Sequence, residues 1–156
     1  MRSKFVELLD TEMNENEKIY LILGDVGFGF FDEIQNKYSD RIINPGASEQ
    51  LIMGMASGIA MEKYIPVVYS ITPFILFRPF EFIRNYLNHE QLPVKIVGVG
   101  RDDDYGSLGF THYAHDDSII ENSFPNIKIF RPTTENELEL KSFLYEDTPA
   151  YLNLRR

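Results

Sequence analysis

Hydrophobic and polar positions along this chain form blocks that predict strands and helices in alternation. Short, continuous apolar runs are typical of strands buried on both faces, and they predict strands at 19–23, 41–44, 65–71, 94–99, 127–130 and 151–154. Segments with helical spacing or helix-start signals predict helices at 4–12, 30–38, from 49 onward, and at 72–89, 116–122 and 134–145. The pattern therefore predicts six strands, with helices before and between them.

Strands that alternate with helices predict a parallel sheet covered by helices on both faces. The fold class is therefore α/β, with a sheet of about six strands. Ligands of such sheets bind at the carboxyl ends of the strands. We expect the functional site in the loops that follow strands there, at 24–29, 44–49, 71–74 and 100–112.

The stretch from 42 to 60 carries the strongest candidate site residue. The turn at Pro45 and Gly46 ends a strand, Ser48 is a good N-cap, and Glu49 falls in the first turn of an apolar helix. No other charge follows until Glu62. On residue type alone, such an acid more often only favours the helix dipole. Glu49 is a site candidate because it lies at the sheet edge where ligands bind.

Composition excludes several classes of partner. A chain of 156 residues suits one domain, and its net charge of −9 argues against binding to nucleic acid or to an anionic membrane. The absence of cysteine excludes disulfides and thiolate metal sites and fits a reducing compartment. Because the N-terminus lacks the apolar segment of a signal peptide and no run has membrane-span length, we expect a cytoplasmic domain.

Three weaker motifs have structural explanations. Glycines at 24, 27 and 29 depart from the G-x-G-x-x-G order of dinucleotide-binding turns. Asn44 also stands at the end of the second strand, where that motif has an acid that binds the ribose. A tight turn is therefore favoured over nucleotide binding. The acids at 102–104 favour a solvated loop, since three adjacent acids cannot all point at one ion. We therefore expect no metal site in this chain. His112 beside Thr111, and His115 beside two acids, remain candidates for acid–base chemistry.

Phenylalanines recur every third residue at Phe74, Phe77 and Phe80, near one helical face. Such a stripe is more often core than a ligand shelf. It begins, however, at the edge of the sheet where ligands bind, and aromatic rings there can stack on a flat heteroaromatic ligand.

Five stretches together match one known family in order and spacing. They are Asn44-Pro-Gly-Ala-Ser-Glu-Gln, Thr72-Pro-Phe-Ile-Leu-Phe-Arg-Pro-Phe, Leu92-Pro-Val-Lys-Ile-Val-Gly, Gly109-Phe-Thr-His and Pro125-Asn-Ile-Lys-Ile-Phe-Arg-Pro. From about 18 to 154, the chain resembles the pyrimidine-binding domain of transketolase-like thiamine diphosphate enzymes. The resemblance implies the thiamine diphosphate-binding fold, with residues 1–156 as a single pyrimidine-binding domain.

The resemblance also implies roles for particular residues. Glu49 corresponds to the family acid that hydrogen-bonds N1′ of the aminopyrimidine and favours the imino tautomer that deprotonates the thiazolium. Phe74, Phe77 and Phe80 fall where the family stacks the pyrimidine ring. His112 corresponds to a histidine near the thiazolium, which transfers a proton or binds substrate.

One loop departs from the family pattern. Family transketolases have a second histidine near the position of Gly100 and a Glu-Asp-Gly ahead of the Thr-His pair, and both are missing here. The usual ketose-phosphate substrate is therefore not implied. Arg101 is instead a candidate for holding a carboxylate or phosphate of the substrate, although an exposed loop arginine is the commoner case.

Two parts of the family's enzymes are not found in the chain. The Gly-Asp-Gly motif with a distant Asn, which binds magnesium and diphosphate, is missing, and so is the C-terminal domain. The resemblance thus implies a split enzyme, active only with a diphosphate-domain partner subunit that holds Mg²⁺, as a heterotetramer with two chains of each kind. Residues Gly54 and Gly58 permit close helix–helix approach, at the partner interface or equally on the chain's own sheet.

The expected reaction is two-carbon ketol transfer, or a related acyloin or decarboxylation reaction, on a small ketose or 2-oxo acid. The alternative is a non-catalytic binding or regulatory module that keeps the fold. Glu49 in its family position favours the catalytic interpretation.

Overall fold

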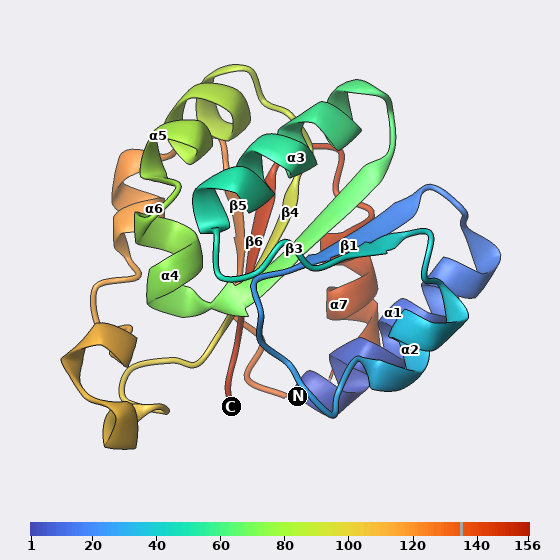
Figure 1. The fold of residues 1–156 in the computed structure, drawn as a ribbon. Helices are drawn as coiled ribbons and strands as arrows, with labels where there is room; N and C mark the ends of the chain where they lie inside the picture. Colours follow the sequence, from blue (N-terminus) through green and yellow to red (C-terminus); the bar gives the residue numbers. More distant parts are fainter. Residues whose placement is uncertain (135) are drawn as a thin grey trace.

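In the computed structural model, which describes residues 1–134 and 136–156, the chain folds around a six-stranded parallel sheet. The strand order is β2-β1-β3-β4-β6-β5 (Figure 1). The strands are β1 Ile19–Leu23, β2 Ile42–Ile43, β3 Ile65–Ile71, β4 Lys95–Val99, β5 Lys128–Phe130 and β6 Ala150–Leu154. This arrangement confirms the predicted α/β class and parallel sheet.

Helices cover both faces of the sheet (Figure 1). One face carries α1 Arg2–Glu15, α2 Asp32–Lys37 and α7 Glu137–Leu144. The other carries α3 Glu49–Met61, α4 Thr72–Phe77, α5 Phe80–Phe82, the π-helical segment η1 Ile83–His89 and α6 Ile119–Ser123. Two 3₁₀ turns, η2 Gly106–Leu108 and η3 Phe110–His112, lie in the loop after β4.

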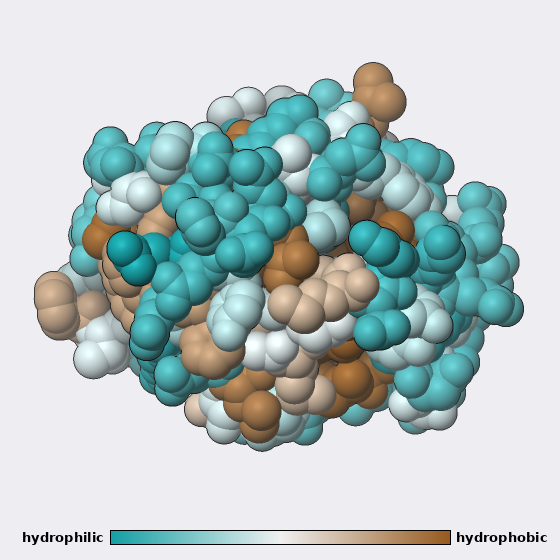
Figure 2. All heavy atoms as spheres, turned by 90° about the horizontal axis from the view of Figure 1, so that it is seen from above, coloured by the Kyte–Doolittle hydropathy of each residue, from teal (hydrophilic) through white to brown (hydrophobic). Residues whose placement is uncertain are grey.

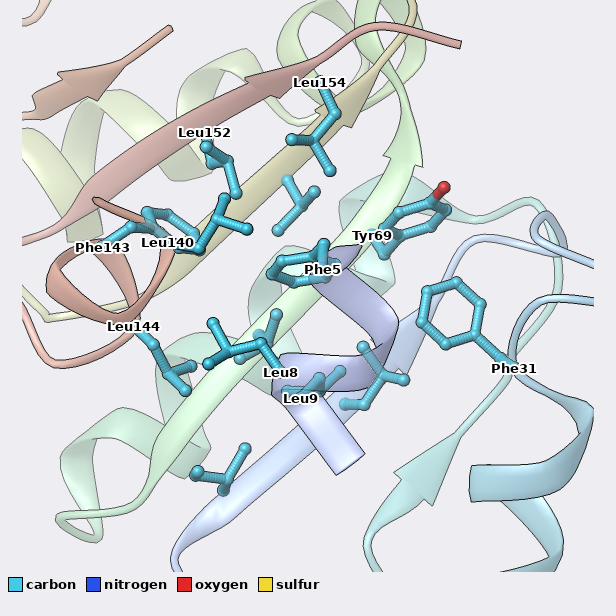
Figure 3. Packing of buried hydrophobic residues seen from close by; sticks show 14 of the residues in the cluster. Phe5, Leu8, Leu9, Phe31, Tyr69, Leu140, Phe143, Leu144, Leu152 and Leu154 are labelled. Carbon is cyan, nitrogen blue, oxygen red and sulfur yellow. The ribbon is translucent and has the colours of Figure 1, made fainter. Parts of the chain in front are cut away.

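Each face of the sheet has its own hydrophobic core. Figure 3 shows Phe5 and Leu9 of α1 packed over the strands, near Phe143 of α7. Because side chains alternate along a strand, Tyr69 of β3 points into this core. Its neighbour Ser70 is directed to the opposite face, on which α3 lies.

The prediction of one continuous helix from 72 to 89 is wrong, because the helix is interrupted. The chain leaves α4 at Arg78 and Pro79 and resumes as α5 and η1, which ends at His89. Proline has no N–H to donate to the carbonyl of Ile75, and its ring crowds that turn, so the helix breaks there.

Helix starts also differ from expectation. Ser48 occupies the N-cap position of α3, but its hydroxyl makes no capping hydrogen bond. Helix α7 begins at Glu137 instead of near 134, because the side chain of Asn136 caps it by accepting from the backbone N–H groups of Leu138 and Glu139. Glu135, which falls within the helix predicted at 134–145, lies outside the described residues. Within the part of the chain that is described, no helix combines the length and apolarity needed to span a membrane.

Candidate functional site

Glu49 is buried at the carboxyl edge of the sheet. It is the first residue of α3, and only 1% of its surface is exposed. Its Oε1 accepts a hydrogen bond from Ser70 Oγ at 3.2 Å, and its Oε2 accepts one from Arg78 Nη1 at 2.6 Å. The buried carboxylate is thus satisfied by one hydroxyl and one guanidinium.

Gly24 makes room for the hydroxyl that contacts Glu49. A Cβ on this glycine would lie 2.8 Å from Ser70 Oγ. The backbone N–H of Gly24 donates to the carbonyl of Tyr69 at 3.0 Å, which holds the turn after β1 against the end of β3. The first glycine of the 24–29 turn therefore serves close packing, in line with the structural interpretation of that motif.

Arg78 and Phe74 lie four residues apart and share one side of the chain at the end of α4. The guanidinium carbon of Arg78 lies 3.9 Å from the centroid of the Phe74 ring. The ring of His112 also lies beside this ring, with its centroid 4.9 Å away in an edge arrangement. A carboxylate, a guanidinium, a phenyl ring and an imidazole therefore follow one another along the edge of the sheet.

The three phenylalanines of the predicted stripe occupy different environments. Phe74 lies beside Arg78, whereas Phe77 lines a pocket of about 340 Å³. The other residues of that pocket are Pro73, Phe110, Thr111, Tyr113, His115 and Asp116. The ring of Phe80 lies 4.9 Å from that of Phe124 and packs on the core beneath α5. Only Phe74 stands next to the site formed around Glu49.

His112 is half-buried in the 3₁₀ turn η3. Its Nδ1 lies 3.1 Å from Thr111 Oγ1, within hydrogen-bonding distance. The ring of Tyr105 lies 6.3 Å from the imidazole. The structure thus places the rings of His112 and Phe74 next to each other.

Arg101 is held by the end of β6. Its guanidinium donates to the side chain and the carbonyl of Asn153, and to the carbonyl of Pro132 at 2.9 Å. Asn153 is fully buried and donates in turn to the side chains of Tyr151 at 2.8 Å and Asp117 at 3.2 Å. Sequence analysis missed Asn153, although an amide inside an otherwise apolar strand is a signal that could have identified it.

Two of the three acids at 102–104, Asp102 and Asp104, pair with Arg155 of the same chain. Asp104 accepts hydrogen bonds from the backbone N–H groups of Arg101 and Arg156, both at 3.0 Å, and from Arg155 Nη1 at 3.2 Å. Burial alone would raise the pKa of Asp104, but these hydrogen bonds and the nearby arginine charges lower it. Among residues 1–134 and 136–156, no three His, Cys, Asp or Glu side chains are grouped to hold a metal ion.

Comparison with known proteins gives consistent matches. The family model "Transketolase, pyrimidine binding domain" matches residues 1–155. The chain is 33% identical to one subunit of the apulose-4-phosphate transketolase of Actinobacillus succinogenes over 65% of this chain and 32% of that protein. It is 29% identical to 1-deoxy-D-xylulose-5-phosphate synthase of Dehalococcoides mccartyi over 86% of this chain and 21% of that protein.

A solved structure matches the fold over almost the whole chain. It is a split-gene transketolase, described as an inactive beta4 tetramer, with a TM-score of 0.85 and 26% identity over 99% of this chain and 50% of that one. The chain thus spans half or less of the length of each of these proteins.

Proposed function

Because the chain belongs to the family of transketolase pyrimidine-binding domains, we propose that it holds the aminopyrimidine half of thiamine diphosphate at the site around Glu49. The observation that carries this proposal is the buried carboxylate of Glu49, which Arg78 connects to the face of Phe74. A carboxyl group suits the ring nitrogen N1′ as a hydrogen-bond partner, and a phenyl face suits a flat heteroaromatic ring. The residues present therefore fit this half of the cofactor.

In this proposal each side chain has a defined task. Glu49 exchanges the proton at N1′, in a site where the exclusion of water strengthens the hydrogen bond. Phe74 supports the ring by stacking, Phe77 lines the pocket that includes Thr111, and Phe80 anchors this segment to the core through Phe124. When bound, thiamine diphosphate supplies the nucleophilic carbon that attacks the carbonyl of the substrate.

We assign the contacts with the substrate to the loop after β4. His112 is the candidate for proton transfer or substrate binding, since it touches the ring of Phe74 at the mouth of the site. Arg101 is the second candidate, as a partner for a carboxylate or phosphate, although most of its donors are already engaged with Asn153 and Pro132. We propose a small ketose or 2-oxo acid as the substrate class.

The diphosphate and its Mg²⁺ are assigned in this proposal to a partner subunit, in a heterotetramer of two chains of each kind. Support comes from the similar proteins, which include one subunit of a transketolase and a split-gene transketolase. The reaction we propose is two-carbon ketol transfer, or a related acyloin or decarboxylation step. We propose a cytoplasmic location for the assembly because a chain without cysteine suits a reducing compartment.

The outer side of α3 provides a surface for such a partner. We name it the α3 outer face, and it is lined by Tyr20, Ile43, Met55, Gly58, Ile59, Glu62 and Tyr64, which enclose a hollow of about 420 Å³. Leu51, one helical turn before Met55, is 55% exposed. Figure 2 looks down on the side of the molecule where α3 and α5 lie, and it shows apolar atoms gathered in a band among polar ones. A contiguous apolar surface of this kind marks interaction sites.

Of the two small residues expected to allow close helix packing, only one faces outward. A Cβ on Gly54 would lie 3.1 Å from Phe82 of the same chain, whereas a Cβ on Gly58 would meet no atom within 4 Å. Gly54 therefore serves internal packing, and Gly58 is available to a partner.

The test is turnover of the complex that forms between this chain and the subunit that co-purifies with it, supplied with thiamine diphosphate and Mg²⁺. We expect Glu49→Gln and Glu49→Ala to bind the partner normally and to lose a factor of about 10² or more in kcat, because a positioned proton-transfer group contributes that much. Glu81→Gln, at an exposed acid on α5, is the matched control and should leave kcat unchanged. Unchanged turnover in Glu49→Ala, with the partner bound, would instead support the non-catalytic module.

A further inference from the structure

The guanidinium of Arg78 makes the same two contacts that the proposed function assigns to the aminopyrimidine. Its Nη1 donates to Glu49 Oε2 at 2.6 Å, and its central carbon lies over the ring of Phe74 at 3.9 Å from the centroid. A guanidinium is planar and delocalised and carries its N–H donors on its edge. These are also the recognition features of an aminopyrimidine protonated at its ring nitrogen.

Both oxygens of Glu49 are engaged when Arg78 is in this position. Ser70 occupies Oε1, Arg78 occupies Oε2, and only 1% of the glutamate is exposed to solvent. One face of the Phe74 ring is covered by the same guanidinium. A second planar group can therefore reach the carboxylate only when Arg78 withdraws.

Arg78 is placed so that it can withdraw. Its side chain is 46% exposed, whereas that of its partner Glu49 is buried. The residue lies between α4 and α5, immediately before Pro79, where the helix is interrupted. Moving the guanidinium from this position into water disrupts no hydrophobic core, because an arginine head is readily solvated.

We propose that Arg78 is an internal placeholder that neutralises Glu49 until the pyrimidine ring of the cofactor binds, and then gives way to the ring. This inference rests on the proposed function. The placeholder keeps the buried carboxylate from being left as an unpaired charge. It also lowers the apparent affinity for the ring, because only the fraction of molecules with Arg78 withdrawn can bind.

The test is calorimetric titration of the full chain with 4-amino-5-hydroxymethyl-2-methylpyrimidine, a probe without thiazolium or diphosphate. We expect Arg78→Gln to bind this probe about tenfold more tightly than the wild type. This factor follows if Arg78 occupies the site in about nine of ten wild-type molecules, because only the remaining tenth can then bind the probe. Arg84→Gln is the matched control, with the same change of charge at an exposed arginine that contacts the side chain of Asn85. It should bind within about twofold of the wild type.

The outcomes separate the two proposals. Equal or weaker binding by Arg78→Gln overturns the placeholder role, while binding itself leaves the proposed function intact. No binding by the wild type and by Arg78→Gln contradicts the proposed function, and the placeholder role with it. Should Arg78→Gln fail to fold, Arg78→Lys serves instead: its ammonium neutralises Glu49 without stacking on Phe74, so it should also bind the probe more tightly than the wild type.

Discussion

Gly24 and Ser70 are packed so closely that a Cβ on the glycine would lie 2.8 Å from the serine Oγ. Real Cβ atoms essentially never approach another atom at this distance. We expect Gly24→Ala to displace Ser70 from Glu49 and to lower the free energy of unfolding by about 1–3 kcal/mol, as overpacking does elsewhere. Urea unfolding measures this change.

The control for this variant is Gly106→Ala, where the added Cβ would meet its nearest atom at an ordinary 3.6 Å. Its free energy of unfolding should stay within about 0.5 kcal/mol of the wild type, the usual range for surface substitutions. A Gly24→Ala protein as stable as Gly106→Ala would show that the turn after β1 shifts freely, against the packing described here.

The two glycines of α3 should respond differently to alanine. Alanine favours a helix over glycine by roughly 1 kcal/mol, and at Gly58 nothing opposes that gain. At Gly54 the added Cβ meets Phe82 at 3.1 Å. Both variants share the helix gain, so the close contact with Phe82 should leave Gly54→Ala less stable than Gly58→Ala by about 1 kcal/mol in urea unfolding of the isolated chain.

The same pair tests the α3 outer face. Gly58→Ala should weaken association with the proposed partner subunit, since it adds a methyl group to the proposed contact surface, whereas Gly54→Ala should not. Sedimentation of mixtures of the two subunits measures the association. A partner that binds both variants as well as the wild type would place the interface elsewhere.

The central strands of the sheet were predictable from the sequence because they are buried on both faces. Such strands read as continuous apolar runs with abrupt ends, and the predicted bounds of 19–23 and 65–71 match β1 and β3. The strand predicted at 41–44 is only the two residues of β2 in the structure. An edge strand pairs on one side only, so its ends are set by the neighbouring loops.

The contacts of the site were less predictable. Ser70 is one hydroxyl in an apolar strand, and no pattern in sequence shows that it meets Glu49 twenty-one residues earlier. The spacing of the phenylalanines predicted one shared face, but the break at Pro79 redirects Phe80 to the core. The partnership of Arg78 with Glu49 depends on that same break, and hence on tertiary structure.

Asn153 should be among the most sensitive buried positions. Its amide contacts Arg101, Tyr151, Asp117 and Thr72, so alanine leaves several buried polar groups without a partner. We expect Asn153→Ala to lose about 2–4 kcal/mol of the free energy of unfolding. Asn122→Ala, at an exposed site on α6, should lose under about 0.5 kcal/mol.

Hydrogen exchange gives a second measurement on this variant. Because Asn153 anchors Arg101 at the start of the loop that carries His112, amides of the loop at 101–112 should exchange faster in Asn153→Ala than in Asn122→Ala. Equal exchange rates would mean that the loop is held independently of this amide.

Glu12 links α1 to α7 and should make stability depend on acid pH. Its buried carboxylate accepts from Tyr145 Oη at 2.7 Å and pairs with Lys141 at 2.6 Å. Burial alone would raise the pKa of Glu12, but these partners lower it below the ordinary value of 4.5. The stabilisation is therefore present above pH 4.5 and is lost as the pH falls through the lower pKa of the folded state.

We expect Glu12→Gln to be less stable than the wild type by about 1–3 kcal/mol at pH 7. The difference should shrink as the pH falls below 4.5, which urea unfolding at a series of pH values measures. A difference that stays constant down to about pH 3 would show that the charge of Glu12 contributes nothing.

Lys95 should produce a pH dependence of the same sign, on the alkaline side. Its buried ammonium on β4 donates to the carbonyl of Thr148 at 2.9 Å and to that of Glu146. Burial lowers the pKa of Lys95 to about 8, although Glu146 and Asp147 act against this shift. Between pH 8 and the ordinary pKa of 10.5, the unfolded chain binds more protons than the folded one, so stability rises with pH.

The comparison is with Lys95→Met, which removes the titrating group and keeps most of the side-chain volume. Relative to this variant, the free energy of unfolding of the wild type should rise by up to about 1.4 kcal/mol per pH unit between pH 8 and 10.5. If the difference in free energy of unfolding does not depend on pH over this range, the lowered pKa of Lys95 is contradicted.

The two outermost strands of the sheet, β2 and β5, have only two and three residues. Each leaves a short row of unpaired backbone groups, so the sheet offers little template on which a foreign strand could extend it. Assembly through continuous β-structure between subunits is thereby disfavoured, and so is edge-to-edge aggregation of the chain. Association of this protein should consequently be governed by side chains on its helices and loops, which can be altered one at a time without disturbing the sheet.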